Sequence, residues 1–444
     1  MSIDTLKEVS ARIRAAALAA ADPGAAVRRA VSLRGDTLVA AGSSALLRGR
    51  LSLIAVGKAA MAMTCGALDR LGSRLDSGIV VHPHGYPTNA LSDARLELCP
   101  SAHPVPDEHG LAAAGRVLAA VDAMGEGDLC LVLLSGGGSS LLPCPLPPVT
   151  LDEMMATTRL LLMSGADIHA LNTVRKHLSA LAGGRLALRC AGTMVTLAIS
   201  DVVGDDPAVI ASGPTVADPS TFADAAGVLR RYRLQDRVPR AVTALFDDGC
   251  AGRVPETAKS LPPRHAYAVI ASGNVAAEAA AVEANRCGFA PLILTTSLQG
   301  EAREAGRLLA SVATECRMHE RPLPAPACII AAGETTVTVT GSGSGGRNQE
   351  IALSAAMELR DQPDVLLTSF ATDGKEGNTD AAGAYASSET VAAGIARGLD
   401  PHACLGNNDA HRFLSATGEL IVTGPTGTNV NDLSFILVTR PSRP

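Results

Sequence analysis

Short aliphatic runs alternate along this chain with longer segments in which apolar residues recur at helical spacing. Short apolar runs are typical of buried strands, and apolar residues roughly three or four positions apart are typical of helices with one buried face. Strands that alternate with helices in this way predict an α/β fold. We expect strands at residues 51–56, 78–81, 128–134, 194–199, 267–271, 291–295, 328–332, 335–340, 365–370, 419–422 and 434–438, and the clearest helices at residues 3–20, 151–163, 172–181 and 301–319.

A segment without periodicity separates two such series. Residues 247–264 mix charges with Gly and Pro, as a linker does. A chain of 444 residues is also longer than most domains with a single hydrophobic core. We therefore predict two α/β domains, one over residues 1–255 and one over residues 256–444.

Composition excludes several classes of protein. Lys and Arg number 38 against 44 Asp and Glu, a formal charge of −6, and no basic run is available to neutralise a nucleic-acid backbone. Aromatic residues make up only 2% of the chain, so stacking platforms for single strands are not expected. No stretch approaches the roughly 20 apolar residues of a membrane helix, and we expect no secretory leader. These features predict a cytoplasmic protein that binds neither nucleic acid nor membrane.

Ten cysteines are scattered through the chain without a CxxC pair. Cysteine zinc sites and dithiol redox centres usually need such close spacing. We therefore expect buried free thiols, as in a reducing cytoplasm.

The most informative motif is a loop of alternating Gly and Ser at residues 341–346. A run of alternating Thr and Val precedes the loop, and we expect it to form a hairpin with the strand before it. Arg347 follows the loop and begins an apolar helix. Successive N–H groups in a glycine loop, with a helix N-terminus behind them, can cradle phosphate or another anion. A guanidinium adds a planar fork for phosphoryl or carboxylate oxygens. Gly345, Gly346 and Arg347 are therefore candidate binding residues; a flexible surface turn is the alternative.

The same loop matches the G-x-G-x-x-G fingerprint of dinucleotide-binding proteins through Gly341, Gly343 and Gly346. That fingerprint follows a fully buried parallel strand. Here the preceding run alternates Thr and Val, which indicates a half-exposed antiparallel strand. The next strand also ends further on than the usual ribose-binding acid. We therefore do not favour a dinucleotide site.

Two further candidates follow strands in the first half of the chain. Lys58 comes after the strand at 51–56, in a turn that is not a P-loop because the upstream Gly and the following Ser or Thr are absent. Ligand sites of α/β proteins are built at such strand ends. The strand at 128–134 ends in a loop whose N–H and hydroxyl groups can hold an anion, and its candidates are Ser135, Gly136, Gly137, Gly138 and Ser139. A solvated lysine and a tight structural turn are the alternatives.

A polar cluster shares one face of the helix expected at 172–181. Asn172 lies three positions before Arg175 and four before Lys176, so these side chains are neighbours on the helix surface. The apolar stripe of this helix is supplied by Leu171, Val174 and Leu178. The polar face either lines a cleft and binds substrate or is simply solvated, and the sequence leaves both possibilities open.

Aspartates beside glycine offer oxygen ligands to Mg²⁺ in two places. Asp201 follows the strand at 194–199, and Asp373 and Asp380 flank a loop after the strand at 365–370. The loop lacks the calcium-loop register, so an EF-hand is not predicted. All three are candidate metal ligands, and Asp201 is also a candidate catalytic residue; a turn with a helix cap is the alternative.

Together, and in this order, the motifs resemble the glycerate 2-kinase family of the two-domain MOFRL type, which also carries the label hydroxypyruvate reductase. The matching pieces span nearly the whole chain, so their joint signal is strong although each is weak. They are residues 56–59, 134–140, 172–179, 200–205, 211–215, 345–350 and 372–374. Glu376 stands where this family pattern has Asp, which keeps the charge and changes its reach.

The resemblance implies two α/β/α layered domains, the first Rossmann-like, with the site in a cleft between them. It implies an enzyme that uses ATP and Mg²⁺ to phosphorylate D-glycerate at its 2-hydroxyl, giving 2-phosphoglycerate and ADP. Lys58 and Arg347 match the family's catalytic Lys and Arg, and one from each domain would neutralise the phosphoryl group as it transfers. A homodimer is a possible assembly.

Two other functions compete with this one. An NAD(P)H-dependent hydroxypyruvate reductase needs a dinucleotide fingerprint and usually a catalytic His; His103 and His177 are available, but the sequence marks neither. A non-catalytic sugar-acid or nucleotide-binding protein needs only one glycine cradle. Charged strand ends in both halves of the chain argue against that second alternative.

Overall fold

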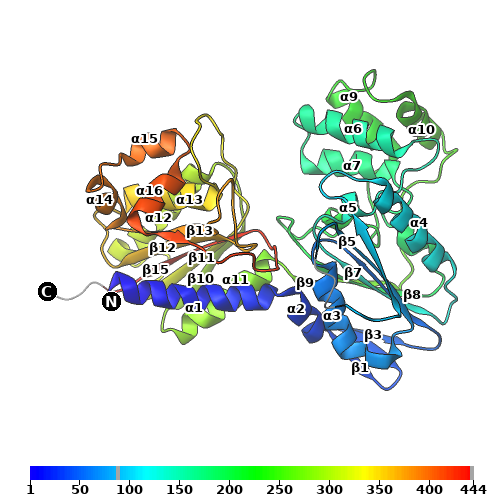
Figure 1. Cartoon of the computed structure of the whole chain (residues 1–444), viewed down its shortest axis with the longest axis horizontal. Helices are drawn as coiled ribbons and strands as arrows, with labels where there is room; N and C mark the ends of the chain where they lie inside the picture. The colour runs from blue at the N-terminus through cyan, green and yellow to red at the C-terminus, as the bar shows by residue number, and fades with distance from the viewer. Residues whose placement is uncertain (87–90, 441–444) are drawn as a thin grey trace. The chain divides into compact units, whose positions relative to one another are not determined.

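The computed structural model describes residues 1–86 and 91–440 and divides the chain into two compact units (Figure 1). The first unit contains residues 23–270, and the second contains residues 1–22 together with residues 271–444. The boundary expected after residue 255 therefore falls inside the first unit. Both units combine strands and helices, as the hydrophobic pattern predicts.

A six-stranded sheet with the order β6-β5-β4-β7-β8-β9 forms the centre of the first unit. Its strands are β4 (Leu51–Val56), β5 (Ser77–Pro83), β6 (Leu96–Ser101), β7 (Leu129–Leu134), β8 (Thr193–Ile199) and β9 (Ala266–Ala271). The pairs from β6 to β8 are parallel, and β7 is buried along its whole length, as aliphatic runs covered on both faces should be. Counted along the chain, the order is the 3-2-1-4-5-6 of the Rossmann fold, which confirms the Rossmann-like prediction.

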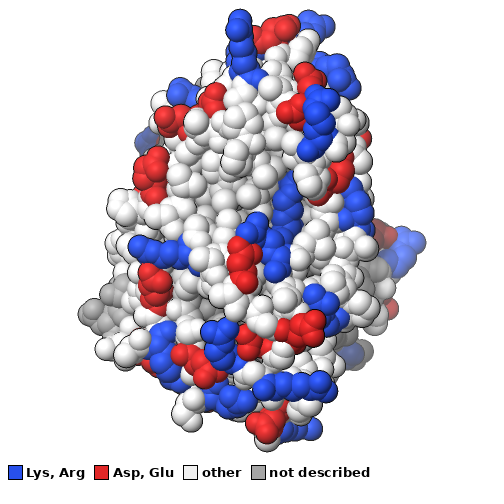
Figure 2. Space-filling view, turned by 90° about the vertical axis from the view of Figure 1, so that its right-hand side faces the viewer, with Lys and Arg blue, Asp and Glu red and all other residues white. Residues whose placement is uncertain are grey.

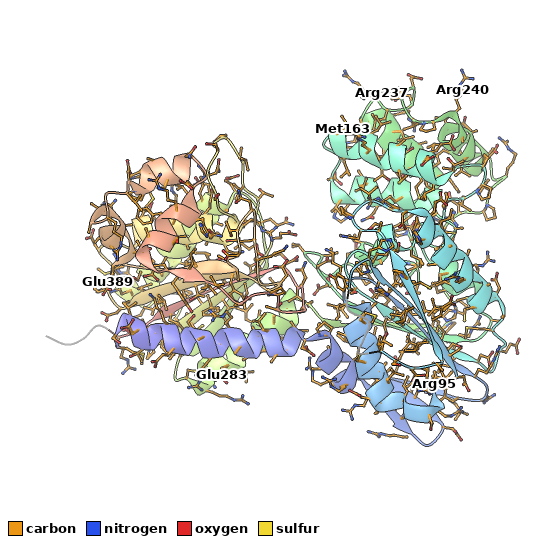
Figure 3. The ribbon with its side chains drawn as sticks, viewed as in Figure 1. Arg95, Met163, Arg237, Arg240, Glu283 and Glu389 are labelled. Carbon is orange, nitrogen blue, oxygen red and sulfur yellow. The ribbon has the colours of Figure 1, made fainter. Side chains whose placement is uncertain are left out.

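Helices cover this sheet and also form a layer of their own in the first unit. α3 (Ala60–Leu71) and α4 (Glu108–Asp122) pack against strands of the sheet. The helical layer consists of α6 (Leu151–Met163), α7 (Ile168–Leu178), α9 (Phe222–Arg231) and α10 (Arg240–Cys250). Met163, Arg237 and Arg240 lie at the outer ends of this layer and point away from the unit (Figure 3).

The first unit also contains strands that the sequence pattern did not reveal. β1 (Val31–Arg34), β2 (Thr37–Ala40) and β3 (Ser43–Leu46) form a small antiparallel sheet that follows α2 (Pro23–Ala30). Each of these strands has four residues and only partial burial. Runs this short carry too little periodicity to be distinguished from turns.

The second unit has a mixed sheet with the order β10-β11-β15-β12-β13-β14. Its strands are β10 (Ala290–Leu298), β11 (Ala327–Gly333), β12 (Val365–Ala371), β13 (Gly383–Ser387), β14 (Leu420–Ile421) and β15 (Asp432–Val438). β10 and β11 are parallel, and the other pairs are antiparallel. α12 (Ala302–His319) and α13 (Arg347–Glu358) cover one face, and α1 (Ile3–Ala21) and α11 (Gly273–Arg286) cover the other (Figure 1).

The N-terminal helix α1 belongs to the second unit because its contacts lie there. Ser10 Oγ is 2.8 Å from Thr368 Oγ1 of β12, and Arg12 Nη2 donates to Glu283 Oε1 of α11 at 2.7 Å. The apolar stripe of α1 is correctly predicted by its spacing, but a stripe does not indicate which sheet it will cover.

The hairpin predicted for residues 328–332 and 335–340 is wrong. β11 pairs with β10 on one side and with β15 on the other, so both of its edges are occupied. In the described chain, residues 335–340 form only one isolated bridge, between Thr336 and Glu301. None of the helices in residues 1–86 and 91–440 is both long and apolar enough to cross a membrane.

Candidate active site

Lys58 and the loop at residues 135–139 meet where the strand order of the first unit reverses. Lys58 follows β4, and the loop follows the neighbouring β7. The Lys58 N–H donates to the carbonyl oxygen of Gly136 at 3.0 Å, and the Ala59 N–H donates to Ser135 Oγ at 3.0 Å. Ligands of open α/β sheets bind at this switch point. The structure therefore brings two of the predicted site segments together.

Two more side chains reach this loop. A Cβ atom on Gly136 would lie 2.1 Å from Asp201 Oδ2, and a Cβ atom on Gly137 would lie 3.0 Å from His103 Nε2 and 3.5 Å from Lys58 Cε. Gly137 also has a φ of +88°, a conformation that favours glycine. Lys58, His103 and Asp201 therefore surround two consecutive glycines.

His103 lies beside this loop, although the sequence did not mark it. It follows β6, a strand that the hydrophobic pattern also missed, so its place at this edge of the sheet could not be foreseen. Burial, and to a smaller degree the charge of Lys58, lower the pKa of His103. The imidazole is therefore mainly neutral near neutral pH and can accept a proton.

Asn172 supports the loop from the helical layer. Its Oδ1 accepts a hydrogen bond from Ser212 Oγ at 2.9 Å, and Ser212 Oγ lies 2.8 Å from Ser139 Oγ. Asn172 and Ser212 are both buried. This chain of hydrogen bonds holds the Ser139 hydroxyl in place, and it already uses the amide oxygen of Asn172.

Arg175, one turn further along α7, lines a cavity of about 580 Å³. The cavity has a mainly apolar wall together with the hydroxyls of Ser139, Ser140, Ser179 and Ser212. Among the described residues no acidic side chain pairs with the guanidinium, and burial lowers the pKa of Arg175. The volume is typical of small-molecule sites. An unpaired cation in such a wall attracts an anionic ligand.

Lys176, the third member of the cluster on α7, has a different setting. It is buried, and its ammonium lies 3.2 Å from Asp218 Oδ1. Asp218 also accepts a hydrogen bond from Ser220 Oγ at 2.8 Å. The charge of Lys176 is thus matched inside the fold, as in a structural ion pair, and its role toward substrate stays a prediction.

In the second unit, Arg347 is the first residue of α13 and is held by two carboxylates. Its Nε lies 2.9 Å from Asp432 Oδ2, and its Nη1 contacts Glu334. Glu334 follows β11 and Asp432 begins the adjacent antiparallel β15, so both acids lie at the same edge of the sheet. Burial would lower the pKa of Arg347, but the two carboxylates outweigh it and raise that pKa.

The glycine loop at residues 341–346 directs its N–H groups into the second unit itself. Side-chain oxygens accept hydrogen bonds of 2.8–3.1 Å from the N–H groups in and just before the loop. These oxygens belong to Asn378, Asn407, Asn408 and Asp409. The cradle expected for a bound anion is filled here by the protein's own acceptors.

Glu376 occupies the helix N-terminus behind this loop. Its carboxylate accepts hydrogen bonds from the Asn348 N–H at 2.6 Å and from the Gln349 N–H at 2.8 Å. A negative group at the first turn of a helix is stabilised by the helix dipole. Burial raises the pKa of Glu376 to about 7. The residue that departs from the family pattern is thus the cap of α13, next to Gly346.

The two aspartates predicted for the second unit differ in exposure. Asp373 follows β12, is half-buried, and accepts a hydrogen bond from the Lys375 N–H at 3.2 Å. The side chain of Asp380 is 86% exposed and lies 3.9 Å from His411. Within the described chain, neither of them, nor Asp201 in the first unit, belongs to a group of three close ligand side chains.

Charges of both signs are interspersed on the face of the molecule shown in Figure 2, around a broad uncharged area. This agrees with the mildly acidic formal charge of −6.

Two family models match the chain. A domain of unknown function, DUF4147, matches residues 9–247, and the MOFRL family matches residues 327–432. A glycerate 2-kinase of Pyrococcus horikoshii is 41% identical over 436 residues, which cover 98% of this chain and 98% of that protein. A D-glycerate 2-kinase of Thermotoga maritima is 44% identical over 392 residues, which cover 88% and 91%. A protein of Agrobacterium vitis named provisionally as a hydroxypyruvate reductase is 42% identical over 436 residues, which cover 97% and 94%.

Solved structures agree with these matches. The crystal structure of a Pyrococcus horikoshii protein superposes with a TM-score of 0.90 at 40% identity, covering 98% of this chain and 99% of that chain. The crystal structure of a glycerate kinase of Thermotoga maritima superposes with a TM-score of 0.88 at 40% identity, covering 98% and 100%. Similarity of this extent over nearly the whole length shows that the chain belongs to the glycerate 2-kinase family.

Proposed function

We propose that this protein transfers a phosphoryl group from ATP to the 2-hydroxyl of D-glycerate, giving 2-phosphoglycerate and ADP. The observation that carries the proposal is the position of Lys58 beside the glycine loop at the switch point of a Rossmann-like sheet. Phosphoryl transfer needs positioning and positive charge near the transferring group more than covalent chemistry. The names of the Pyrococcus and Thermotoga relatives support the same reaction.

Lys58 and the loop at residues 135–139 would bind the phosphoryl oxygens. In the described chain the Lys58 ammonium makes no ion pair, so its charge is available to a substrate. The loop adds N–H groups and the Ser139 hydroxyl, which Ser212 and Asn172 hold in place. Groups fixed in advance stabilise developing charge without reorganising during the reaction.

Arg175 would bind the carboxylate of D-glycerate from inside the cavity. A carboxylate is the anion that a guanidinium fork matches best in shape. The hydroxyls on the same wall can accept or donate hydrogen bonds to the substrate's own hydroxyl groups.

The reacting 2-hydroxyl must lose a proton, and two residues beside Gly136 and Gly137 can take it. Asp201 carries a carboxylate that touches Gly136, and His103 is a mainly neutral imidazole that touches Gly137. Either group lies close to Lys58, where the phosphoryl group would be held. A positioned base of this kind typically contributes about 10²- to 10⁴-fold to a rate.

Mg²⁺ fits the residues present. This ion usually binds through one or two carboxylates together with substrate phosphates, so a dedicated cluster of acids is not required. Asp201, which follows β8 in the first unit, would hold it there, and Asp373, which follows β12 in the second unit, is a separate candidate ligand. When bound, Mg²⁺ neutralises phosphate charge.

Arg347 would supply a second cation from the second unit. Its pairing with Asp432 and Glu334 keeps the guanidinium charged and fixes its orientation. We propose that it acts in the same reaction as Lys58, as its match to the family's catalytic Arg implies.

A reductase activity on hydroxypyruvate is the second candidate, and the name of the Agrobacterium relative is the reason to test it. The residues of this chain do not favour a reductase. In a Rossmann sheet the dinucleotide fingerprint follows the first strand, here β4, and after Gly57 this chain has Ala59 and Ala62 in place of the second and third glycines. The N–H groups of residues 341 to 345 already have acceptors.

A paired assay on the purified protein tests the proposal. One arm follows ADP release with D-glycerate, ATP and Mg²⁺, and the other follows loss of NADH or NADPH with hydroxypyruvate. ADP release alone, with product that enolase consumes directly, would establish 2-phosphorylation. Loss of reduced nicotinamide without ADP release would contradict the kinase proposal.

A further inference from the structure

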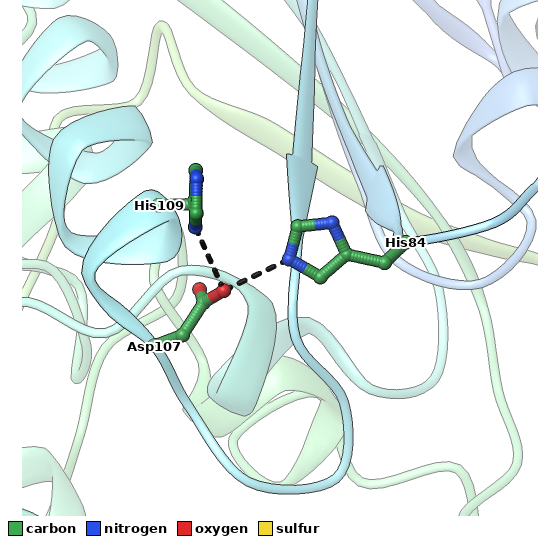
Figure 4. Close-up of side chains that lie close together, drawn as sticks. All are labelled: His84, Asp107 and His109. Atoms are coloured by element: carbon green, nitrogen blue, oxygen red, sulfur yellow. Dashed lines mark hydrogen bonds and ion pairs between the residues drawn. The ribbon is translucent and has the colours of Figure 1, made fainter.

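Three side chains that the phosphotransfer reaction does not use converge in the first unit. His84 follows β5, Asp107 precedes α4, and His109 lies in the first turn of that helix. His84 Nε2 lies 2.8 Å and His109 Nδ1 lies 3.1 Å from the same atom, Asp107 Oδ2 (Figure 4). The three ligand atoms all lie within 4.8 Å of one another.

The two oxygen atoms of Asp107 have separate roles. Oδ1 accepts hydrogen bonds from the Gly110 N–H at 2.9 Å and the Ala102 N–H at 3.3 Å, which caps α4 and fixes the plane of the carboxylate. Oδ2 is left to face the two imidazoles. Metal-ligating carboxylates are commonly held in this way, with one oxygen bound by the protein and the other directed at the ion.

The set of donors is also the right kind for a transition metal. Two imidazole nitrogens and one carboxylate oxygen form the protein ligands of many three-ligand zinc sites, in which a fourth position stays open to water. The same donors suit Ni²⁺ and Cu²⁺ but not Mg²⁺, which prefers oxygen ligands only. The side chains of His84 and His109 are 46% and 70% exposed, so an ion can reach them from solvent.

We propose that His84 Nε2, Asp107 Oδ2 and His109 Nδ1 bind one divalent transition-metal ion. Metal–ligand bonds of about 2.0–2.2 Å require the ligand atoms to lie within about 4 Å of one another. The two distances to Asp107 already meet this condition. The two exposed imidazoles need only small rotations for their nitrogens to meet it as well.

The site would act on the loop that carries His103. Asp107 binds the Ala102 N–H, and His103, the next residue, contacts Gly137 beside Lys58. A metal ion on Asp107 would therefore tie the end of β5 to the start of α4 and restrain the loop between Ser101 and Asp107. Metal binding itself does not depend on the proposed kinase activity.

The test is a calorimetric titration of the full-length protein with NiCl₂ and with ZnCl₂ after treatment with a chelator. We expect one ion per chain, and thermal unfolding that shifts upward with metal because the ion binds only the folded state. His84→Ala and His109→Ala should each weaken binding by more than the roughly 10- to 100-fold that loss of an outer partner costs.

Controls separate this site from other metal ligands. His319→Ala removes an exposed imidazole outside the cluster and should leave affinity unchanged. The Cys250→Ser background removes the one thiol among the ten free cysteines that is exposed rather than buried or half-buried. With Co²⁺, a spectrum without a thiolate charge-transfer band supports the proposal, and such a band contradicts it. Equal stoichiometry and affinity in the His84→Ala/His109→Ala double variant would also overturn it, whatever the kinase assay shows.

Discussion

The two glycine loops of this protein look alike in sequence and differ in their surroundings. Each is rich in Gly and Ser, and each has a cationic residue nearby, Lys58 for one and Arg347 for the other. In the first unit, the described residues provide no acidic partner for Lys58 or Arg175. In the second unit, Arg347 has two carboxylate partners and the loop N–H groups have side-chain acceptors.

From this comparison we infer that a glycine loop is a candidate anion site where the fold supplies no acceptors for its N–H groups. The oxygens that fill the loop at 341–346 come from residues some 30 to 70 positions away, such as Asn378 and Asn408. An unmatched cation attracts a ligand, whereas a matched one mainly stabilises structure. Variants of the first region should therefore lower activity alone, and variants of the second should also lower stability.

The largest expected effect is that of Lys58→Ala on turnover. Loss of the charge beside the loop at 135–139 should lower kcat by about 10²- to 10³-fold. Because the ammonium makes no ion pair in the described chain, the urea midpoint should stay unchanged. Steady-state kinetics and urea unfolding measure the two quantities. Lys58→Arg, which keeps the charge, should retain more activity, and near wild-type kcat in folded Lys58→Ala would remove this residue from the site.

Arg347→Ala should lower both activity and stability. Breaking a buried ion pair costs about 3–5 kcal/mol, and the partial exposure of Arg347 should place its cost at the lower end. Urea unfolding measures the loss. In the double variant Arg347→Ala/Asp432→Asn the uncompensated charge is gone, so stability should largely return while activity does not. A double variant as unstable as the single one would show that the pair is not the cause.

Arg175→Leu should differ from Arg347→Ala, because it should lower activity without lowering stability. Losing a hydrogen-bonded contact to the substrate carboxylate costs about 1.5–3 kcal/mol, or about 10- to 100-fold in kcat/KM. The free energy of unfolding should be unchanged or higher, because the substitution removes an unpaired charge from a mainly apolar cavity wall. Arg159→Leu is the matched control, since Arg159 lines the same cavity but is exposed. Equal effects of the two substitutions on kcat/KM would contradict the role of Arg175.

The smallest effect concerns pH. Burial raises the pKa of Glu376 to about 7 and that of Asp432 to about 6, so the folded protein keeps protons that the unfolded chain has lost. The resulting stability is complete below the ordinary carboxyl pKa and disappears as pH rises through about 6 to 7. Each group contributes at most about 1.4 kcal/mol per pH unit. The free energy of unfolding, measured with urea at several pH values across this range, should fall less steeply with pH in Glu376→Gln than in the unchanged protein. An equal dependence on pH would contradict the raised pKa.

Much of the fold could be predicted because its signals are local. The aliphatic runs at β4, β7 and β8 have the length and composition of buried strands. In α6 and α12 the apolar residues recur at helical spacing and form one stripe along the helix. The order of the strands in the first sheet then brings Lys58 and the loop at 135–139 together. The hairpin at 328–340 failed because β15, a strand almost 100 residues later, occupies the edge of β11.

The candidate site was predictable to a smaller extent. Lys58, Arg175 and the loop at 135–139 were predicted from strand ends and helix spacing, and their roles stay predictions. His103 was missed because β6 was not recognised, and Lys176 has its charge matched by Asp218, which lies 42 positions away. Neither fact has a signal in the neighbouring residues.

The sequence by itself determined the α/β class, most strands and helices, and the family to which the chain belongs, because these depend on local periodicity and on motifs read in order. Only the tertiary structure decided which charges have partners: Arg347 and Lys176 do, and Arg175 does not. It also decided that His84, Asp107 and His109 share one oxygen atom. Burial and electrostatic pairing depend on distances between residues that are remote in the chain, and only folding sets those distances.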